Sequence, residues 1–172
     1  KIMSVGMFYG MESVKTVDFS KANTTLTYAR GMIANSGVET FKFPEGSNSG
    51  YVPYFFFTGT KVKTVDMSPI KYLYKYAFYK SGITEITIPG TVITVQDGVF
   101  RESTDLTTVV IEEGVKTISA EMFYGCTSLK SADLPDNIEF MEDGTYYGCS
   151  SLRSVKLPAD LKIIGNCAFQ YS

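Results

Sequence analysis

The chain repeats itself about every 23 residues, and this period limits its possible folds more than any other feature. Segment 8–20 agrees in residue type with segment 123–135 almost throughout, and further copies lie between them. The copies are marked by the first apolar residue after each polar turn, at spacings of 24, 24, 21, 23, 23 and 23 residues: Val14, Val38, Val62, Ile83, Leu106, Leu129 and Leu152. A unit of this length cannot bury its own apolar residues, so the sequence predicts a stack of units that share one core.

Each of these marker residues opens a run in which the first, fourth and sixth residues are apolar. All 21 such positions are apolar, although hydrophobic residues make up only 44% of the chain. The last two alternate with a polar residue, which is typical of a strand with one buried side, and the runs are too short for helical periodicity. The predicted inward residues are Val14, Val17 and Phe19; Val38, Phe41 and Phe43; Val62, Val65 and Met67; Ile83, Ile86 and Ile88; Leu106, Val109 and Ile111; Leu129, Ala132 and Leu134; Leu152, Val155 and Leu157.

A second apolar position stands five residues before the aromatic anchor of each unit, and it indicates a second extended segment that closes the coil. Its members are Met3, Tyr28, Val52, Leu73, Val95, Ile118, Met141 and Ile164. The sequence therefore predicts a right-handed, mainly β solenoid with a parallel sheet of about seven strands and little helix. Residues 1–172 form one domain in this prediction, with about seven repeats of 21–24 residues and a partial C-terminal one.

A longer motif identifies a family. Segment 123–135 reads Phe-x-x-Cys-x-Ser-Leu-x-x-x-x-Leu-Pro, segment 146–158 repeats it with Tyr for Phe, and Leu161-x-x-Ile164-Gly-x-x-Ala168-Phe169 follows. This pattern resembles the BspA-like, or Treponema-type, bacterial leucine-rich repeat, closely from residue 70 onward and more loosely before it, where the Ser-rich turn 47–50 replaces an expected apolar pair. The resemblance implies an extracellular or cell-surface protein of bacteria that binds other proteins, such as host matrix proteins or bacterial surface proteins. It supplies no catalytic motif.

The composition excludes several classes of function. The chain has no histidine, which removes Ser–His and Cys–His nucleophile pairs and every His-containing metal site. A net charge of −2 argues against nucleic-acid binding, and no apolar run approaches the ~20 residues that span a bilayer. Neighbouring carboxylates in the pairs Glu112-Glu113 and Glu142-Asp143 point to opposite faces of a strand, so they do not converge as a glycosidase requires. We expect no catalytic residue, no metal ligand and no cofactor; the Asn23-Thr24-Thr25 sequon matters only in a eukaryotic secretory host.

Three cysteines lie in apolar surroundings: Cys126, Cys149 and Cys167. They are predicted to be small buried side chains. Because Cys126 and Cys149 occupy equivalent places in two successive repeats, a disulfide between them is the alternative.

The outward positions of the first strand form the candidate protein-binding surface, because solenoids use such an extended face for recognition. Threonine and serine in register also suit a parallel sheet for local reasons, so a structural ladder is the alternative interpretation. A second candidate patch is formed by tyrosines that alternate with Lys71, Leu73 and Lys75, and these could instead be half-buried. The candidate residues are Thr16, Asp18, Thr40, Lys42, Thr64, Asp66, Glu85, Thr87, Thr108, Ser131, Asp133, Ser154 and Lys156 in the first surface, and Tyr72, Tyr74 and Tyr76 in the second.

The favoured function is therefore a non-enzymatic, adhesin-like module that binds a protein. The alternative is a structural spacer or stalk that displays another domain. Both ends of the chain are cut within a repeat, and solenoids normally need atypical capping repeats. This makes end-to-end pairing with another copy a further expectation.

Overall fold

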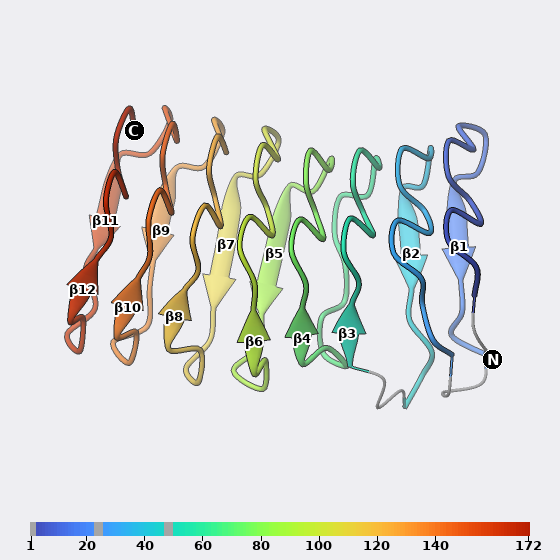
Figure 1. The fold of residues 1–172 in the computed structure, drawn as a ribbon, viewed down its shortest axis with the longest axis horizontal. Helices are drawn as coiled ribbons and strands as arrows, with labels where there is room; N and C mark the ends of the chain where they lie inside the picture. Colours follow the sequence, from blue (N-terminus) through green and yellow to red (C-terminus); the bar gives the residue numbers. More distant parts are fainter. Residues whose placement is uncertain (1–2, 23–25, 47–49) are drawn as a thin grey trace.

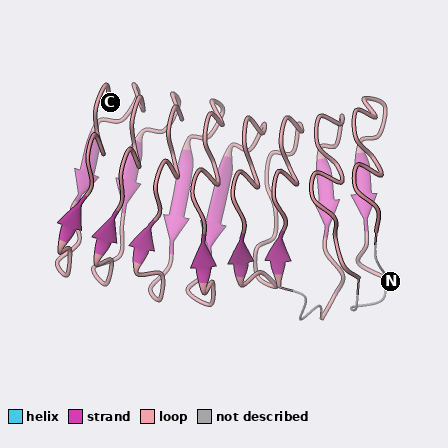
Figure 2. Ribbon diagram, viewed as in Figure 1, coloured by secondary structure: helices cyan, strands magenta, loops and turns pink. Residues whose placement is uncertain are grey.

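The computed structural model describes residues 3–22, 26–46 and 50–172, and within them the chain winds into stacked coils that contain strands, turns and no helix (Figures 1 and 2). Most coils have one strand on one side, a turn, and a second, shorter strand on the other side. The sequon Asn23-Thr24-Thr25 and residues 47–49 of the Ser-rich turn lie outside the described residues. The predicted β-solenoid is confirmed.

Two rows of short parallel strands run along the stack, one on each side of the coils (Figure 1). The first row consists of β1 (Thr16–Asp18), β2 (Thr40–Lys42), β5 (Glu85–Ile88), β7 (Thr108–Ile111), β9 (Ser131–Asp133) and β11 (Ser154–Lys156). The second row consists of β3 (Tyr51–Val52), β4 (Tyr72–Leu73), β6 (Thr94–Val95), β8 (Thr117–Ile118), β10 (Phe140–Met141) and β12 (Ile163–Ile164). Repeat-equivalent residues face each other across every pair, as Val17 faces Phe41 and Ile86 faces Val109.

The first row differs from the prediction in one respect, because its hydrogen-bonded ladder is interrupted. It splits into the pairs β1–β2, β5–β7 and β9–β11, and the segment 64–66, expected as the strand of the third repeat, is not a strand. The repeat length changes from 24 to 21 residues at this place. The first break, between β2 and β5, lies at this shortened repeat, whereas the second break, between β7 and β9, lies between repeats of 23 residues. The second row keeps its ladder β3–β4–β6 across the shortened repeat.

The core lies between the two rows and contains nearly all of the predicted inward side chains. Val38, Ile83 and Leu106 have no exposed surface at all. One inward prediction on the last coil is wrong, because Leu157 is 50% exposed. Ile164 lies in the predicted second extended segment, as part of β12, and is 47% exposed. No described residue covers the outer side of this coil, so a position on the inner side of a strand is not enough to bury these side chains.

A continuous stack of aromatic rings runs through the core along the axis of the solenoid. Successive centroids lie 4.7–5.7 Å apart, and the rings are nearly parallel, with interplanar angles of 3–25°. Offset stacking of this kind adds to the hydrophobic gain of burial. The members of this aromatic stack are Phe57, Phe78, Phe100, Phe123, Tyr146 and Phe169.

A buried column of small polar side chains runs beside the aromatic stack. Ser103 donates a hydrogen bond to the carbonyl oxygen of Phe78 on the preceding coil, at 2.6 Å. Cys126 and Cys149 occupy the same column, and their thiols donate to the carbonyl oxygens of Phe100 and Phe123, each at 3.1 Å. Both thiols are buried and free, as the first interpretation predicted, and they form no disulfide. Burial raises the pKa of Cys149 to about 12, so its thiol stays protonated.

Cys167 contradicts the prediction, because it is exposed. It does not belong to the column of Cys126 and Cys149. It stands in the turn of the last coil with a positive φ of 55°, at the place that Gly144 holds one repeat earlier. Its side chain therefore points away from the core.

In the turn that leads from the second strand row to the first, two positions four residues apart adopt the left-handed backbone conformation. Glycine fills many of them, but several carry large side chains that ordinarily avoid a positive φ. The pairs are Gly6 and Gly10, Gly31 and Asn35, Phe55 and Gly59, Tyr76 and Lys80, Gly98 and Glu102, Glu121 and Gly125, Gly144 and Gly148, and Cys167 and Tyr171. These two bends per coil reverse the chain between the second strand row and the first.

Candidate functional site

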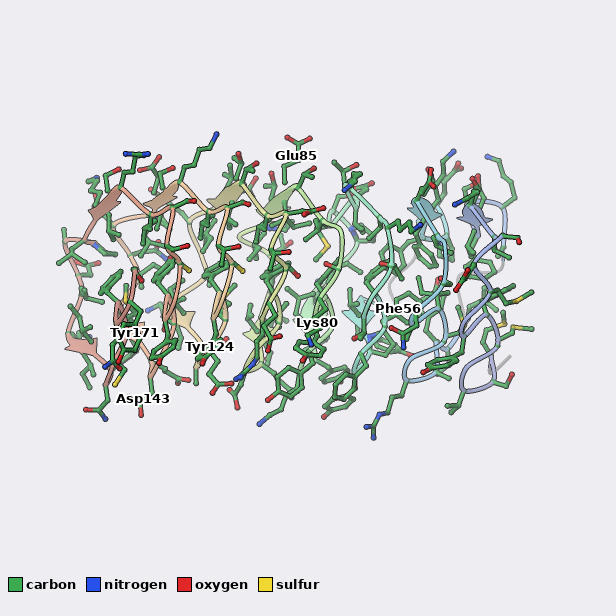
Figure 3. The ribbon with its side chains drawn as sticks, turned by 90° about the horizontal axis from the view of Figure 1, so that it is seen from above. Phe56, Lys80, Glu85, Tyr124, Asp143 and Tyr171 are labelled. Atoms are coloured by element: carbon green, nitrogen blue, oxygen red, sulfur yellow. The ribbon has the colours of Figure 1, made fainter. Side chains whose placement is uncertain are left out.

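The outer side of the first strand row, here called the front face, carries the first predicted set of binding residues. Twelve of the thirteen are exposed and Ser131 is half-buried. The candidate residues are exposed because alternate side chains of a strand point to opposite sides. Thr16 and Asp18 are thus exposed, while Val17 between them is buried. Figure 3 shows Glu85 pointing outward from this face, on the other side of the coils from Tyr124.

The hydroxyl groups of the front face are not used to hold the sheet together. Thr16 lies beside Thr40, and Ser131 lies beside Ser154, yet no hydrogen bond joins either pair of side chains in the described structure. The column next to them behaves differently, since Thr107 donates a hydrogen bond to the carbonyl oxygen of Thr84 at 3.0 Å. The structural ladder thus belongs to the flanking column, and the candidate hydroxyls remain available to a ligand.

Charges near the N-terminal end of the front face neutralise one another from coil to coil. The ammonium group of Lys42 lies 3.3 Å from the carboxylate of Asp18, and that of Lys15 lies 3.0 Å from Glu39. Hydrogen bonds from Ser20, and more weakly the charge of Lys42, hold the pKa of Asp18 below its ordinary value. These exposed ion pairs contribute little to stability, but they leave this end of the face without a strong net charge.

The middle of the front face is hollowed where the strand ladder opens. This front hollow has a volume of about 600 Å³, and its lining includes Thr64, Asp66, Glu85, Thr87, Val110 and Glu112. A second hollow of about 490 Å³ adjoins it and shares Asp66 and Ser68. Sequence reasoning placed most of these residues on the surface, but it did not predict that they surround a depression.

The predicted tyrosine patch lies on the opposite side of the coils and does not join the front face (Figure 1). Tyr72 in β4 is 38% exposed. Tyr74 is half-buried and stacks on Tyr54, with centroids 5.0 Å apart. Tyr76 is half-buried in the following turn and stacks on Phe55, with centroids 5.3 Å apart. The three tyrosines therefore lie in a strand and a turn, and two of them cover neighbouring rings.

The described residues offer no metal centre. No group of three or more Cys, Asp and Glu side chains among them could hold a metal ion. The neighbours Glu112 and Glu113 diverge, since Glu112 lines the front hollow and Glu113 does not. As for a membrane span, no described segment forms a helix of the length and hydropathy required.

The chain matches known leucine-rich repeat proteins. A crystal structure of such a protein from Bacteroides ovatus superposes with a TM-score of 0.74 at 26% sequence identity; the match covers 99% of this chain and 50% of that one, so this chain spans half the length of that relative. A leucine-rich repeat protein from Eubacterium ventriosum gives a TM-score of 0.46 at 13% identity, over 93% of this chain and 77% of that one. No curated protein matches.

The family model described as "BspA type Leucine rich repeat region (6 copies)" matches residues 1–104 and 71–172. The two matches together cover the whole chain. Repeat domains of this type are generally protein-interaction modules. The stacked parallel coils, the inward aliphatic columns and this match agree, and the chain therefore belongs to the family of BspA-type leucine-rich repeat proteins.

Proposed function

We propose that this chain is a non-enzymatic, adhesin-like module that binds a protein through its front face. The observation that carries the proposal is the front hollow, which is surrounded by exposed hydroxyl groups and by carboxylates that form no ion pair with a described Lys or Arg. Solenoids characteristically bind through such extended faces. The family supports a place at the surface of a bacterium or in its secretions, where a host matrix protein or a bacterial surface protein would be the partner.

The shape and charge of the face favour a protein over other ligands. The candidate residues continue along the whole strand row on both sides of the front hollow, which suits an extended partner better than a small molecule. Nucleic acid fits poorly, because the net charge is −2 and Asp66, Glu85 and Glu112 would repel its phosphates.

Two arginine substitutions on the front face are expected to weaken partner binding strongly. In the double variant Thr87→Arg and Val110→Arg, two bulky charges enter the lining of the front hollow. Biolayer interferometry against host matrix proteins and bacterial surface proteins should show micromolar binding by the unchanged domain. We expect the affinity to fall at least about tenfold in the variant, since a clash or a misplaced charge at the centre of an interface is costly.

The matched control is the double variant Ile93→Arg and Ile163→Arg on the side of the second strand row. These isoleucines are 66% and 55% exposed, so the substitutions should leave both folding and binding unchanged. The proposal fails if the control loses binding as strongly as the front-face variant. It also fails for this segment if the intact parent protein binds a macromolecule that this domain does not.

A further inference from the structure

The front hollow carries carboxylates that have no basic partner in the described structure. Asp66, Glu85 and Glu112 line it, all three are exposed, and no ion pair joins any of them to a described Lys or Arg. Two lysines near this part of the face are already engaged: Lys63 is 3.0 Å from the carboxylate of Asp105, and Lys42, which lines the adjoining hollow with Asp66, is 3.3 Å from that of Asp18. This differs from the N-terminal end of the same face, where each carboxylate has a lysine beside it.

Two of these carboxylates are held in place by one oxygen each, which leaves the other oxygen to a ligand. Asp66 accepts a hydrogen bond from the backbone amide of Ser68 at 2.9 Å through Oδ1. Glu112 accepts one from the backbone amide of Gly90 at 3.0 Å through Oε2. Glu85 points outward from β5 and makes no such bond among the described residues (Figure 3). Asp66 and Glu112 are therefore held in place by the backbone, and all three carboxylates are accessible.

The backbone at the floor of the front hollow is also unpaired. The carbonyl oxygen of Lys63 accepts from Thr84 at 2.9 Å, and that of Met67 accepts from Ile70 at 2.9 Å. Between them, the amide and carbonyl groups of residues 64–66 have no backbone partner in the described part of the chain, because the ladder opens here. Backbone groups of this kind are normally paired, so they can bond the main chain or a side chain of a bound peptide.

We infer that the front hollow binds a basic segment of the partner protein, one that carries at least two arginine or lysine side chains. This inference rests on the proposed function and names the chemistry of its ligand. A guanidinium group presents five N–H donors in a planar fork that fits a carboxylate, and the carbonyl oxygens of 64–66 accept the remaining donors. Val110, which is 48% exposed at the lining, provides an apolar surface for the aliphatic stem of such a side chain.

The test uses a fluorescein-labelled peptide of twelve residues in which arginine and serine alternate, with fluorescence anisotropy as the readout. The triple variant Asp66→Asn, Glu85→Gln and Glu112→Gln removes the three charges and keeps each side chain's shape. Its affinity for the peptide should be at least about tenfold lower than that of the unchanged domain, because each lost charge weakens a charge-assisted hydrogen bond. A peptide with glutamate in place of arginine should not bind to either protein.

The matched control is the triple variant Glu12→Gln, Glu113→Gln and Asp160→Asn, which changes the net charge equally at exposed carboxylates outside the front hollow. It should bind the arginine peptide within about twofold of the unchanged domain. An equal loss in both triple variants would show attraction by overall charge, and this overturns the inference. So does failure of the unchanged domain to bind the arginine peptide.

The outcome is separable from that of the proposed function. A protein partner that loses its affinity with Thr87→Arg and Val110→Arg, but keeps it with the charge-removing triple variant, supports the front face as the binding surface and overturns the basic segment as its ligand. If the arginine peptide binds in the front hollow while no protein partner depends on Thr87 and Val110, the hollow has affinity for basic chains, but the proposed function fails and so does the assignment of that segment to a partner protein. Circular dichroism melting curves show that each variant is folded.

Discussion

Replacing Phe100 with alanine is expected to lower the free energy of unfolding by about 3–5 kcal/mol. Phe100 has no exposed surface and lies in the middle of the aromatic stack, 5.1 Å from the ring of Phe78 and 5.7 Å from that of Phe123. Truncation removes two stacking contacts and leaves a cavity that neighbouring coils, held by backbone hydrogen bonds, cannot close. Urea denaturation followed by far-ultraviolet circular dichroism measures the loss.

The control for this substitution is Ile93→Ala, which also shortens an apolar side chain in the same coil. Ile93 is 66% exposed, so its loss should change the free energy of unfolding by less than about 0.5 kcal/mol. Because each coil contacts mainly its neighbours, the Phe100→Ala variant can also unfold in two steps, one for each half of the stack. Equal stability of the two variants would mean that Phe100 does not occupy the core.

Replacing Gly90 with alanine is expected to cost at least about 4 kcal/mol or to prevent folding. A Cβ atom on Gly90 would lie 1.8 Å from the backbone carbonyl oxygen of Glu113, on the next coil. Gly114 makes the reciprocal approach, since its Cβ would lie 2.3 Å from the carbonyl oxygen of Gly90. The obstacle is backbone on both sides and cannot rotate away, so one coil would have to separate from the other. Thermal melting and expression in soluble form both report the effect.

Gly46→Ala separates this close approach from the general cost of changing a glycine. Gly46 has a φ of 67°, but a Cβ there would have no atom within 4 Å. The free energy of unfolding of the Gly46→Ala variant should therefore fall by only about 1–2 kcal/mol, which is the cost of a left-handed backbone conformation for a residue with a side chain. If Gly90→Ala is no more destabilising than Gly46→Ala, the two coils do not approach as described.

Most of the fold could be predicted because the repeat leaves little choice. Val17, Phe41 and Ile86 alternate with polar residues at the same place in each unit, and this alternation alone determines the buried side of the strand. The left-handed turn positions were missed. Glycine four residues apart, as in Gly6 and Gly10, was the available signal, but Phe55 and Tyr76 occupy the same place and obscured it.

The candidate site was only partly predictable, for a related reason. Alternation shows that Thr64, Asp66 and Glu85 point outward, and they do. It does not show where the hydrogen-bonded ladder between neighbouring strands is interrupted, so the front hollow could not be foreseen. In the same way, the pattern placed Leu157 on the inner side of its strand but could not tell whether another coil covers it.

The buried hydrogen bonds between coils have an evolutionary consequence. Cys149 donates to the carbonyl oxygen of Phe123, and Cys126 donates to that of Phe100 in the same way. Excision of residues 107–129, one 23-residue unit, would bring Cys149 to Phe100 and set Tyr146 against the same ring, so the buried hydrogen bond and the ring stacking would both be preserved. Tandem duplication would do the reverse. Genes that encode such proteins can therefore gain or lose whole units by unequal recombination, and the length of the protein can vary between strains while its cross-section stays the same.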